Sequence, residues 1–155
     1  MKKHFLFMFY FLLSSTIAFA QSKPKTHVMN NVQALQKLLT GTGLPFRMAN
    51  DTLAAIPYGG KNISSYQVVV QKISDLYIIY TNLTETLPGK IDETKYKYLL
   101  QQNDHYDAVK IGMSADDNIV YLRADVYKTA ITTALLKRII EQVANVANII
   151  GGDLK

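Results

Sequence analysis

The segment "DAVKIGMSADDNIVYLRADVY", residues 107–127, contains the pattern that decides the fold. In its first half apolar and polar residues alternate, which is the period of a β-strand with one buried face. Strand 107–114 should point Val109, Ile111 and Met113 inward. Strand 118–127 repeats the alternation, and residues 115–118 between them have the composition of a turn. The segment therefore predicts a β-hairpin with one solvated face, whose second strand points inward with Val120, Leu122, Ala124 and Val126.

A second hairpin is predicted upstream. Segments 65–73 and 76–83 are rich in β-branched and aromatic residues, and only Ser74-Asp75 separates them, which favours a tight turn. Residues 53–58 form a further candidate strand, which ends before the turn pair Gly59-Gly60. Both strands of the hairpin are apolar at odd and at even positions. A strand of this kind lies centrally or has its second face covered by something else.

Three helices complete the pattern, over residues 28–40, 92–103 and 129–149. Each has apolar residues at helical spacing. The order helix, three strands, helix, two strands, helix predicts one α+β domain over residues 28–155. Glycine pairs are expected to end the first and last helices, Gly41 and Gly43 at the first, Gly151 and Gly152 at the last. Asp92 is the expected N-cap of the middle helix, and its buried face is expected to consist of Tyr96, Leu99 and Leu100.

The first 20 residues have the features of a cleavable export signal. Lys2 and Lys3 precede an apolar run, and Ala18-Phe19-Ala20 matches the site cut by signal peptidase. The alternative is a membrane anchor, but the apolar stretch 5–20 is shorter than the roughly 20 residues that a spanning helix needs. We therefore expect a signal peptide over 1–20, a flexible leader over 21–27, and a periplasmic or secreted protein.

The composition limits the classes of partner. The chain contains no cysteine, so an exported form has no disulfides and depends on its core. Loss of residues 1–20 removes two lysines and no acidic residue, so the formal charge falls from +5 to +3. The remaining basic residues are scattered, whereas a nucleic-acid surface needs them clustered. We expect neither nucleic-acid binding nor a stable membrane anchor.

The cluster Asp104-His105-Tyr106-Asp107, followed by Asp116 and Asp117, raises the question of a metal or acid–base site. A metal site needs three or four converging ligands, and the only other histidine after the signal is His27 in the leader. We interpret both acidic segments as solvated turns and expect no catalytic residues, no metal and no cofactor. The alternative is a small periplasmic hydrolase that uses His105 and Asp107.

Tyrosine is the residue type that points most to recognition. Tyr66, Tyr77, Tyr80 and Tyr121 lie in predicted strands. Tyrosine on a sheet gives a large contact area at low entropic cost. Ordinary amphipathic strand residues would produce the same pattern. The candidate binding residues are Tyr66, Tyr77, Tyr80, Tyr121 and Arg123.

The chain resembles the type III secretion chaperone-like fold, and within it the YbjN-type proteins, which are described as proposed sensory-transduction regulators. The resemblance rests on "VQALQKLLTGTGLPF", "YQVVVQKISDLYIIYTNL", the hairpin 107–127 and "ITTALLKRIIEQVANVANII". It covers nearly the whole chain after the signal, through element order rather than a catalytic motif. It implies the order α-β-β-β-α-β-β-α with a five-stranded antiparallel sheet flanked by helices, homodimers, and a non-enzymatic binding role.

The two-sided apolar strands also bear on assembly. Helices 28–40 and 129–149 should cover one face of the sheet, which leaves little of the chain for the other. A large uncovered apolar patch is unusual on a soluble monomer. We therefore expect a second copy, or a protein or peptide partner, to cover part of this face or its edge. The alternative is that helix 92–103 and the segment 44–64 cover it within one chain.

Overall fold

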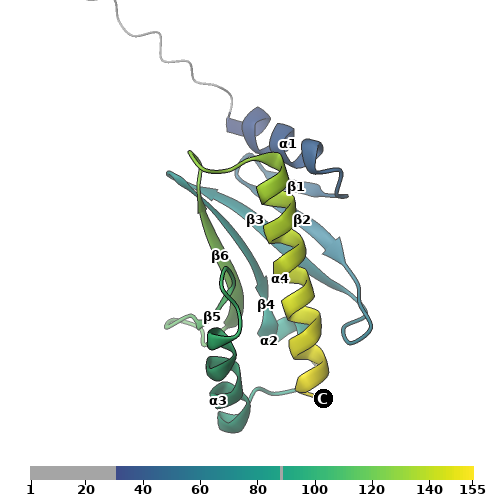
Figure 1. Ribbon diagram of the computed structural model, residues 1–155, viewed down its shortest axis with the longest axis vertical. Helices are drawn as coiled ribbons and strands as arrows, with labels where there is room; N and C mark the ends of the chain where they lie inside the picture. The colour runs from purple at the N-terminus through teal and green to yellow at the C-terminus, as the bar shows by residue number, and fades with distance from the viewer. Residues whose placement is uncertain (1–30, 88) are drawn as a thin grey trace, which may run out of the picture.

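The computed structural model describes residues 31–87 and 89–155 and shows an antiparallel sheet with α4 lying along one face (Figure 1). The sheet has six strands in the order β1-β2-β3-β4-β6-β5, so β6 lies between β4 and β5. In chain order the elements are α1 (Asn31–Thr42), β1 (Arg47–Asn50), β2 (Leu53–Tyr58), β3 (Tyr66–Ile73), β4 (Leu76–Asn82), α2 (Leu83–Thr86), α3 (Glu93–Gln101), the short 3₁₀ helix η1 (Gln102–Asp104), β5 (Lys110–Met113), β6 (Val120–Tyr127) and α4 (Thr133–Asp153).

Both predicted hairpins are confirmed, and the α+β class with an antiparallel sheet is confirmed with them. The five-strand count was wrong, because β1 adds a sixth strand at one edge of the sheet. The segment Arg47–Asn50 has no alternation of apolar and polar residues, and it pairs with β2 across a bulge. Backbone hydrogen bonding to β2, rather than a buried side-chain pattern, therefore makes it a strand. The order also gains the one-turn helix α2 after β4.

The helix ends differ from the prediction in one instructive place. Gly151 and Gly152 do not end α4, which continues to Asp153. A Cβ built on Gly151 would lie 2.5 Å from Ile63 Cγ1, so glycine here allows the helix to pack closely on the segment before β3. Gly41 lies inside α1 and does not end it, whereas Gly43, with φ +70°, follows the helix end at Thr42 as expected. Asp92 caps α3 by accepting a hydrogen bond from the Lys95 N–H.

Two residues predicted to point into the core are exposed. Leu100 on α3 has 63% of its surface exposed, and Met113 on β5 has 53%. Met113 pairs with the buried Val120 and so shares its side of the sheet, but β5 ends there and α3 covers that end only partly. The strand β5 is also shorter than the predicted strand 107–114. The residues before Lys110 form a connection instead, and the Lys110 side chain holds this connection in place. Lys110 Nζ donates to the carbonyl oxygens of Asn103 and Tyr106 at 3.0 and 2.7 Å.

Asn103 covers the outer edge of β5. Its Oδ1 accepts a hydrogen bond from the Ile111 N–H at 2.7 Å, and its Nδ2 donates to the Ile111 carbonyl oxygen at 3.1 Å. These two bonds reproduce one rung of an antiparallel ladder with a side-chain amide. An uncovered strand edge invites pairing with another chain, so one edge of the sheet is protected and the β1 edge is the one that remains for pairing.

The core lies between the sheet and α4. The buried side of α4 presents Leu136, Ile140, Val143 and Ile150, which are fully buried. The opposing side of the sheet presents a row of residues paired across the strands, namely Met48, Ala54, Val70, Ile79 and Ala124. Burial of each large aliphatic side chain contributes roughly 1.5–3 kcal/mol to folding. In the described part of the chain, no helix is long and apolar enough to cross a membrane.

The predicted signal peptide (1–20), the leader (21–27) and residues 28–30 of the first predicted helix lie outside the described residues.

A candidate binding surface on the open face of the sheet

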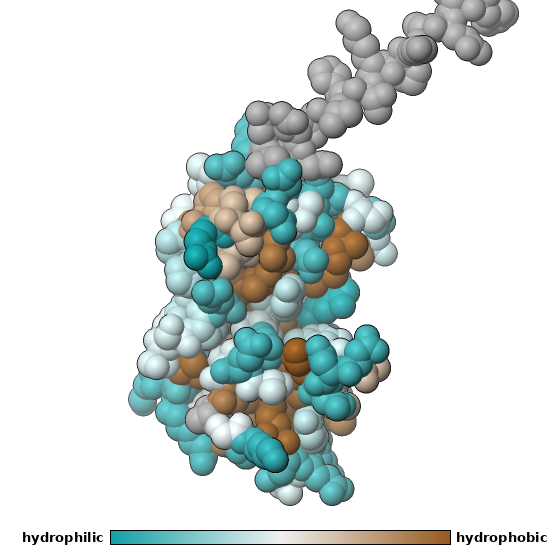
Figure 2. Space-filling model, turned by 180° about the vertical axis from the view of Figure 1, so that it is seen from behind, coloured by the Kyte–Doolittle hydropathy of each residue, from teal (hydrophilic) through white to brown (hydrophobic). Residues whose placement is uncertain are grey.

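The side of the sheet opposite α4, which we name the open face, is covered by no helix among the described residues (Figure 1). Segment 44–64 does not cover it, because 47–50 and 53–58 are themselves strands of the sheet. In the view from behind, apolar groups reach the surface in several places between polar ones (Figure 2). Residues paired across the strands form two neighbouring rows on this face: Arg47, Ala55, Val69, Tyr80, Arg123 and Lys110 in one, and Leu53, Gln71, Ile78 and Asp125 in the other.

A hollow of about 420 Å³ lies on the open face over β3, β4 and β6. Ile78 has only 8% of its surface exposed although no described helix covers it, because the surrounding side chains shield it. We therefore describe Ile78 as the floor of the hollow. The residues that line it are Gln71, Ile73, Ile78, Tyr80, Asn82, Ile119, Tyr121 and Arg123.

A second hollow of about 350 Å³ lies beside the first, over β6 and β5. Tyr121 and Arg123 line both hollows, so the two are adjacent and share a wall. Lys110 and Gly112 bring the second hollow to the β5 edge of the sheet. We call the two hollows together the open-face groove. A groove of this kind, mostly apolar with a few placed polar groups, has the general character of a binding site.

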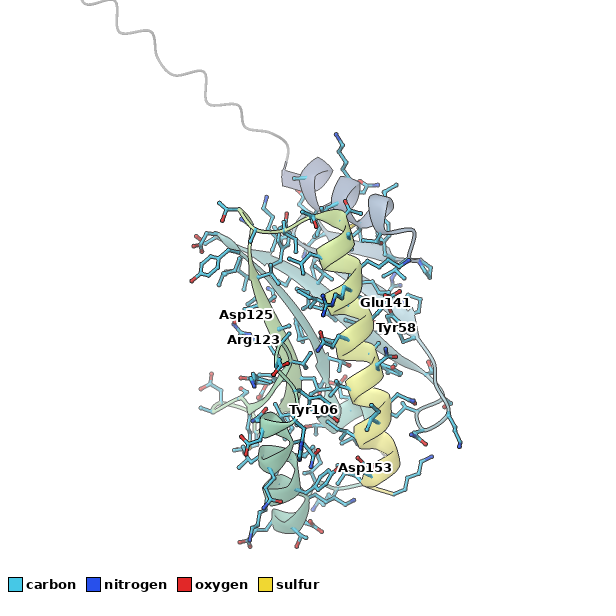
Figure 3. All side chains as sticks on the ribbon, viewed as in Figure 1. Tyr58, Tyr106, Arg123, Asp125, Glu141 and Asp153 are labelled. Atoms are coloured by element: carbon cyan, nitrogen blue, oxygen red, sulfur yellow. The ribbon has the colours of Figure 1, made fainter. Side chains whose placement is uncertain are left out.

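Arg123 is held in place by an ion pair within β6. Its Nε and Nη2 donate to the two carboxylate oxygens of Asp125 at 2.6 and 2.9 Å (Figure 3). The hydrogen bonds that Arg123 donates to Asp125 are the main cause that raises the pKa of Arg123. A bidentate pair fixes the orientation of a guanidinium. Arginine has five N–H donors, so Asp125 leaves some of them for other partners, Tyr121 among them.

Tyr121 depends on the glycine opposite it. Gly112 on β5 pairs with Tyr121 on β6. A Cβ built on Gly112 would lie 2.6 Å from the Tyr121 hydroxyl oxygen and 2.7 Å from its ring carbons. Any other residue would therefore displace the ring from the shared wall of the groove. Burial raises the pKa of Tyr80 above its usual value.

The structure brings together three of the five candidate binding residues. Tyr80, Tyr121 and Arg123 line the same hollow on the open face. Tyr66 and Tyr77 are buried on the side that α4 covers, with 8% and 5% of their surface exposed. The Tyr66 hydroxyl donates to the Ala144 carbonyl oxygen of α4 at 2.7 Å. These two tyrosines therefore belong to the core, because strand parity sends them to the opposite face.

Sequence reasoning expected an uncovered apolar face but did not place the floor and rim of the groove among the candidate binding residues. Ile73 and Ile78 are among the residues that made β3 and β4 apolar at both parities. That surplus was the available signal, because one of the two apolar sets had to lie on the face without helices. The polar lining residues Gln71 and Asn82 carried no such signal, since amides are common on solvated strands.

Neither hollow is lined by the acidic segments around His105. Asp104, His105 and Asp107 are exposed, and they lie on η1 and the connection to β5. Asp116 and Asp117 lie in the hairpin turn, where Asp117 Oδ1 accepts a hydrogen bond from the Ile119 N–H at 3.2 Å. The turn interpretation of both segments is confirmed. Within residues 31–87 and 89–155, no three histidine or acidic side chains converge in a way that could hold a metal ion.

Two stacked tyrosines, Tyr58 on β2 and Tyr66 on β3, differ in the hydrogen bonding of their hydroxyl groups. The rings of Tyr58 and Tyr66 lie 6.0 Å apart. The Tyr66 hydroxyl has its partner on Ala144, whereas the buried Tyr58 hydroxyl has none among the described residues. Burial, with the nearby charge of Glu141, raises the pKa of Tyr58 to about 12 (Figure 3).

We expect opposite effects from removing these two hydroxyl groups. Tyr66→Phe should lower the free energy of unfolding by about 1 kcal/mol, whereas Tyr58→Phe should leave it unchanged or raise it, because a buried hydroxyl without a partner opposes folding. Urea unfolding at neutral pH measures both. The wild type should also lose stability between pH 10 and about 12, where Tyr58 ionises in the unfolded chain but not in the folded one. A larger loss of unfolding free energy from Tyr58→Phe than from Tyr66→Phe would contradict the effects expected from removing the two hydroxyl groups.

Comparison with known proteins identifies the fold. No family model and no curated protein matches the chain. A chain of the HopA1–SchA chaperone–effector complex matches with a TM-score of 0.59 and 8% identity, over 80% of this chain and 97% of that one. A chain of the heterodimeric ExoU–SpcU complex from the type III secretion system of Pseudomonas aeruginosa matches with a TM-score of 0.52 and 16% identity, over 75% and 93%.

YbjN of E. coli, named as a proposed transcription regulator, matches with a TM-score of 0.54 and 11% identity, over 77% of this chain and 86% of that one. At such identities the likeness concerns the fold. It agrees with the resemblance found in the order of the elements. This chain therefore has the fold shared by type III secretion chaperones and YbjN.

Proposed function

We propose that this protein is a non-enzymatic, chaperone-like module that holds an apolar segment of a partner protein in its open-face groove. The observation that carries the proposal is the hollow of about 420 Å³, with Ile78 as its floor and Tyr80 and Tyr121 in its lining, on a sheet face that no described helix covers. Aromatic side chains around a shielded pocket are the usual anchoring points of protein interfaces.

The fold adds support of a different kind. Two of the structures that share this fold are complexes of two different proteins, the HopA1–SchA chaperone–effector complex and the ExoU–SpcU heterodimer. A fold alone does not determine a function, and the proposal therefore depends on the groove. The hydrolase alternative has no comparable support, because His105 and Asp107 are exposed on a connection and line neither hollow.

We also propose that the protein is exported and forms a homodimer. Export is supported by the signal-peptide pattern of residues 1–20, and an intact mass of the exported protein that still includes these residues would contradict it.

Dimerisation is supported by the exposed edge strand β1, since Asn103 covers the opposite edge of the sheet. Two β1 strands could pair about a two-fold axis, the usual symmetry of small oligomers, and would leave both grooves accessible. Sedimentation as a monomer at micromolar concentration would contradict this.

Site-specific photo-crosslinking tests the proposed function directly. Two isoleucines of similar exposure lie on opposite sides of the molecule, Ile73 at the rim of the groove with 42% of its surface exposed and Ile149 on α4 with 48%. A benzophenone amino acid at position 73 should crosslink to a partner protein in the cells that produce this chain, and the same group at position 149 should not. Equal crosslinking from both positions, or crosslinking from position 149 alone, would place the partner elsewhere.

A further inference from the structure

We infer that the partner segment is acidic: it places an apolar side chain over Ile78 and a carboxylate, about three residues away, between Arg123 and Lys110. This inference rests on the proposed function and adds the chemistry of the ligand to it. The charges and the spacing of the residues around the open-face groove, rather than the net charge of the protein, determine which ligand fits.

The charges on the open face favour an acidic ligand. The two rows that form this face contain three cationic side chains, Arg47, Arg123 and Lys110, against the single carboxylate of Asp125. The acidic residues Asp104, on η1, and Asp107, on the connection before β5, line neither hollow. Potentials of opposite sign across an interface direct both encounter and specificity.

The two cations at the β5 side of the groove are held in position before any ligand binds. Asp125 orients the Arg123 guanidinium with two of its five N–H groups and does not use up its capacity to donate. The Lys110 ammonium is anchored by two carbonyl oxygens, which are uncharged and leave its positive charge in place. Because both side chains are already ordered, a carboxylate that binds between them incurs little of the entropic cost of fixing long side chains.

The spacing in the ligand follows from the sheet. Ile78 lies on β4 and Lys110 on β5, and β6 lies between these strands. Neighbouring strands are about 4.8 Å apart, so the two positions are separated by about 10 Å across the sheet. A chain in the polyproline II conformation advances about 3.1 Å per residue and has three residues per turn, so that side chains three residues apart face the same side. A segment that crosses the strands in this conformation therefore carries its carboxylate about three residues from the apolar anchor.

A second copy of this chain is a poorer occupant of the groove. Two open faces set against each other would bring the excess cations of both copies together, and like charges in an interface are unfavourable. The β1 edge, by contrast, lies at the opposite end of the sheet from Lys110. Homodimer formation and peptide binding therefore use different parts of the sheet.

The test compares peptides selected from a random phage-displayed library by the purified protein and by two charge-reversal variants. Lys110→Glu changes the groove, and Arg138→Glu makes a matched change on α4, where Arg138 is exposed. Peptides enriched by the wild type and by Arg138→Glu should carry Asp or Glu about three residues from a large apolar residue. Peptides enriched by Lys110→Glu should lose this acidic preference. The best wild-type peptide should bind Lys110→Glu about tenfold more weakly, a difference of about 1.4 kcal/mol.

The outcomes separate the two proposals. Enriched peptides that depend on Tyr80 and Tyr121 but show no acidic preference would overturn the inference and leave the proposed function standing. An acidic preference that Lys110→Glu retains would overturn the inference as well. Enrichment that is no greater on the wild type than on a variant with both tyrosines replaced by alanine would overturn the proposed function and the inference together.

Discussion

Leu122→Ala is expected to lower the free energy of unfolding by about 2–5 kcal/mol. Leu122 is fully buried at the middle of β6, where it lies in the core between the sheet and α4. Its truncation removes apolar contacts and leaves a cavity that the surrounding strands cannot easily fill, because interiors are close-packed. Urea unfolding followed by circular dichroism measures the loss.

The same strand provides the control for this prediction. Tyr127, also on β6, has 62% of its surface exposed and lies on the open face opposite Leu76. Tyr127→Ala should change the free energy of unfolding by about 0.5 kcal/mol or less, as surface substitutions usually do. Similar losses from the two variants would mean that the open face is buried in the isolated protein, which would remove the basis of the proposed function.

Replacing both Tyr80 and Tyr121 by alanine is expected to weaken partner binding by about 30-fold or more, which corresponds to about 2 kcal/mol. The two side chains line the hollow above Ile78 on neighbouring strands. Their removal opens the hollow to solvent and takes away the aromatic contact area. Fluorescence anisotropy with the partner segment identified by crosslinking measures the change.

The control for this double variant is Ile149→Ala, which removes an exposed apolar side chain from α4. We expect this variant to bind the partner segment as the wild type does. Urea unfolding of the double variant serves as a second control, because loss of the sheet would also abolish binding. Binding of the double variant within threefold of the wild type, which corresponds to about 0.7 kcal/mol or less, would contradict the assignment of the site.

Much of the fold follows from local pattern. The alternation in residues 107–127 predicted the pairing of β5 with β6 and the inward set of β6, and both are observed. The strand β1 could not be found in this way, since it is held by backbone pairing with β2 and its side chains are mostly exposed. The exposure of Leu100 likewise depends on how α3 lies against the end of β5, which no local pattern specifies.

The candidate site was predictable only as a set of residue types. The four candidate tyrosines were equally good, and the structure sends Tyr66 and Tyr77 to the core while Tyr80 and Tyr121 line the open-face groove. Parity along a strand separates the two sets, but it does not say which set meets the helices. The pairing of Arg123 with Asp125 and the closeness of Gly112 to Tyr121 also depend on geometry that residue types do not specify.

The sequence by itself determined the type, order and approximate length of most elements, because periods of about two and 3.6 residues are local properties of strands and helices. It also determined that the hairpin formed by residues 65–73 and 76–83 is apolar on both faces. Only the tertiary structure decided that α4 covers the face of Ile79 and Leu122, and that the face of Ile78, Tyr80 and Arg123 stays open. The physical reason is that one helix of this length can bury only one side of a sheet, and the choice depends on contacts between residues distant in the chain.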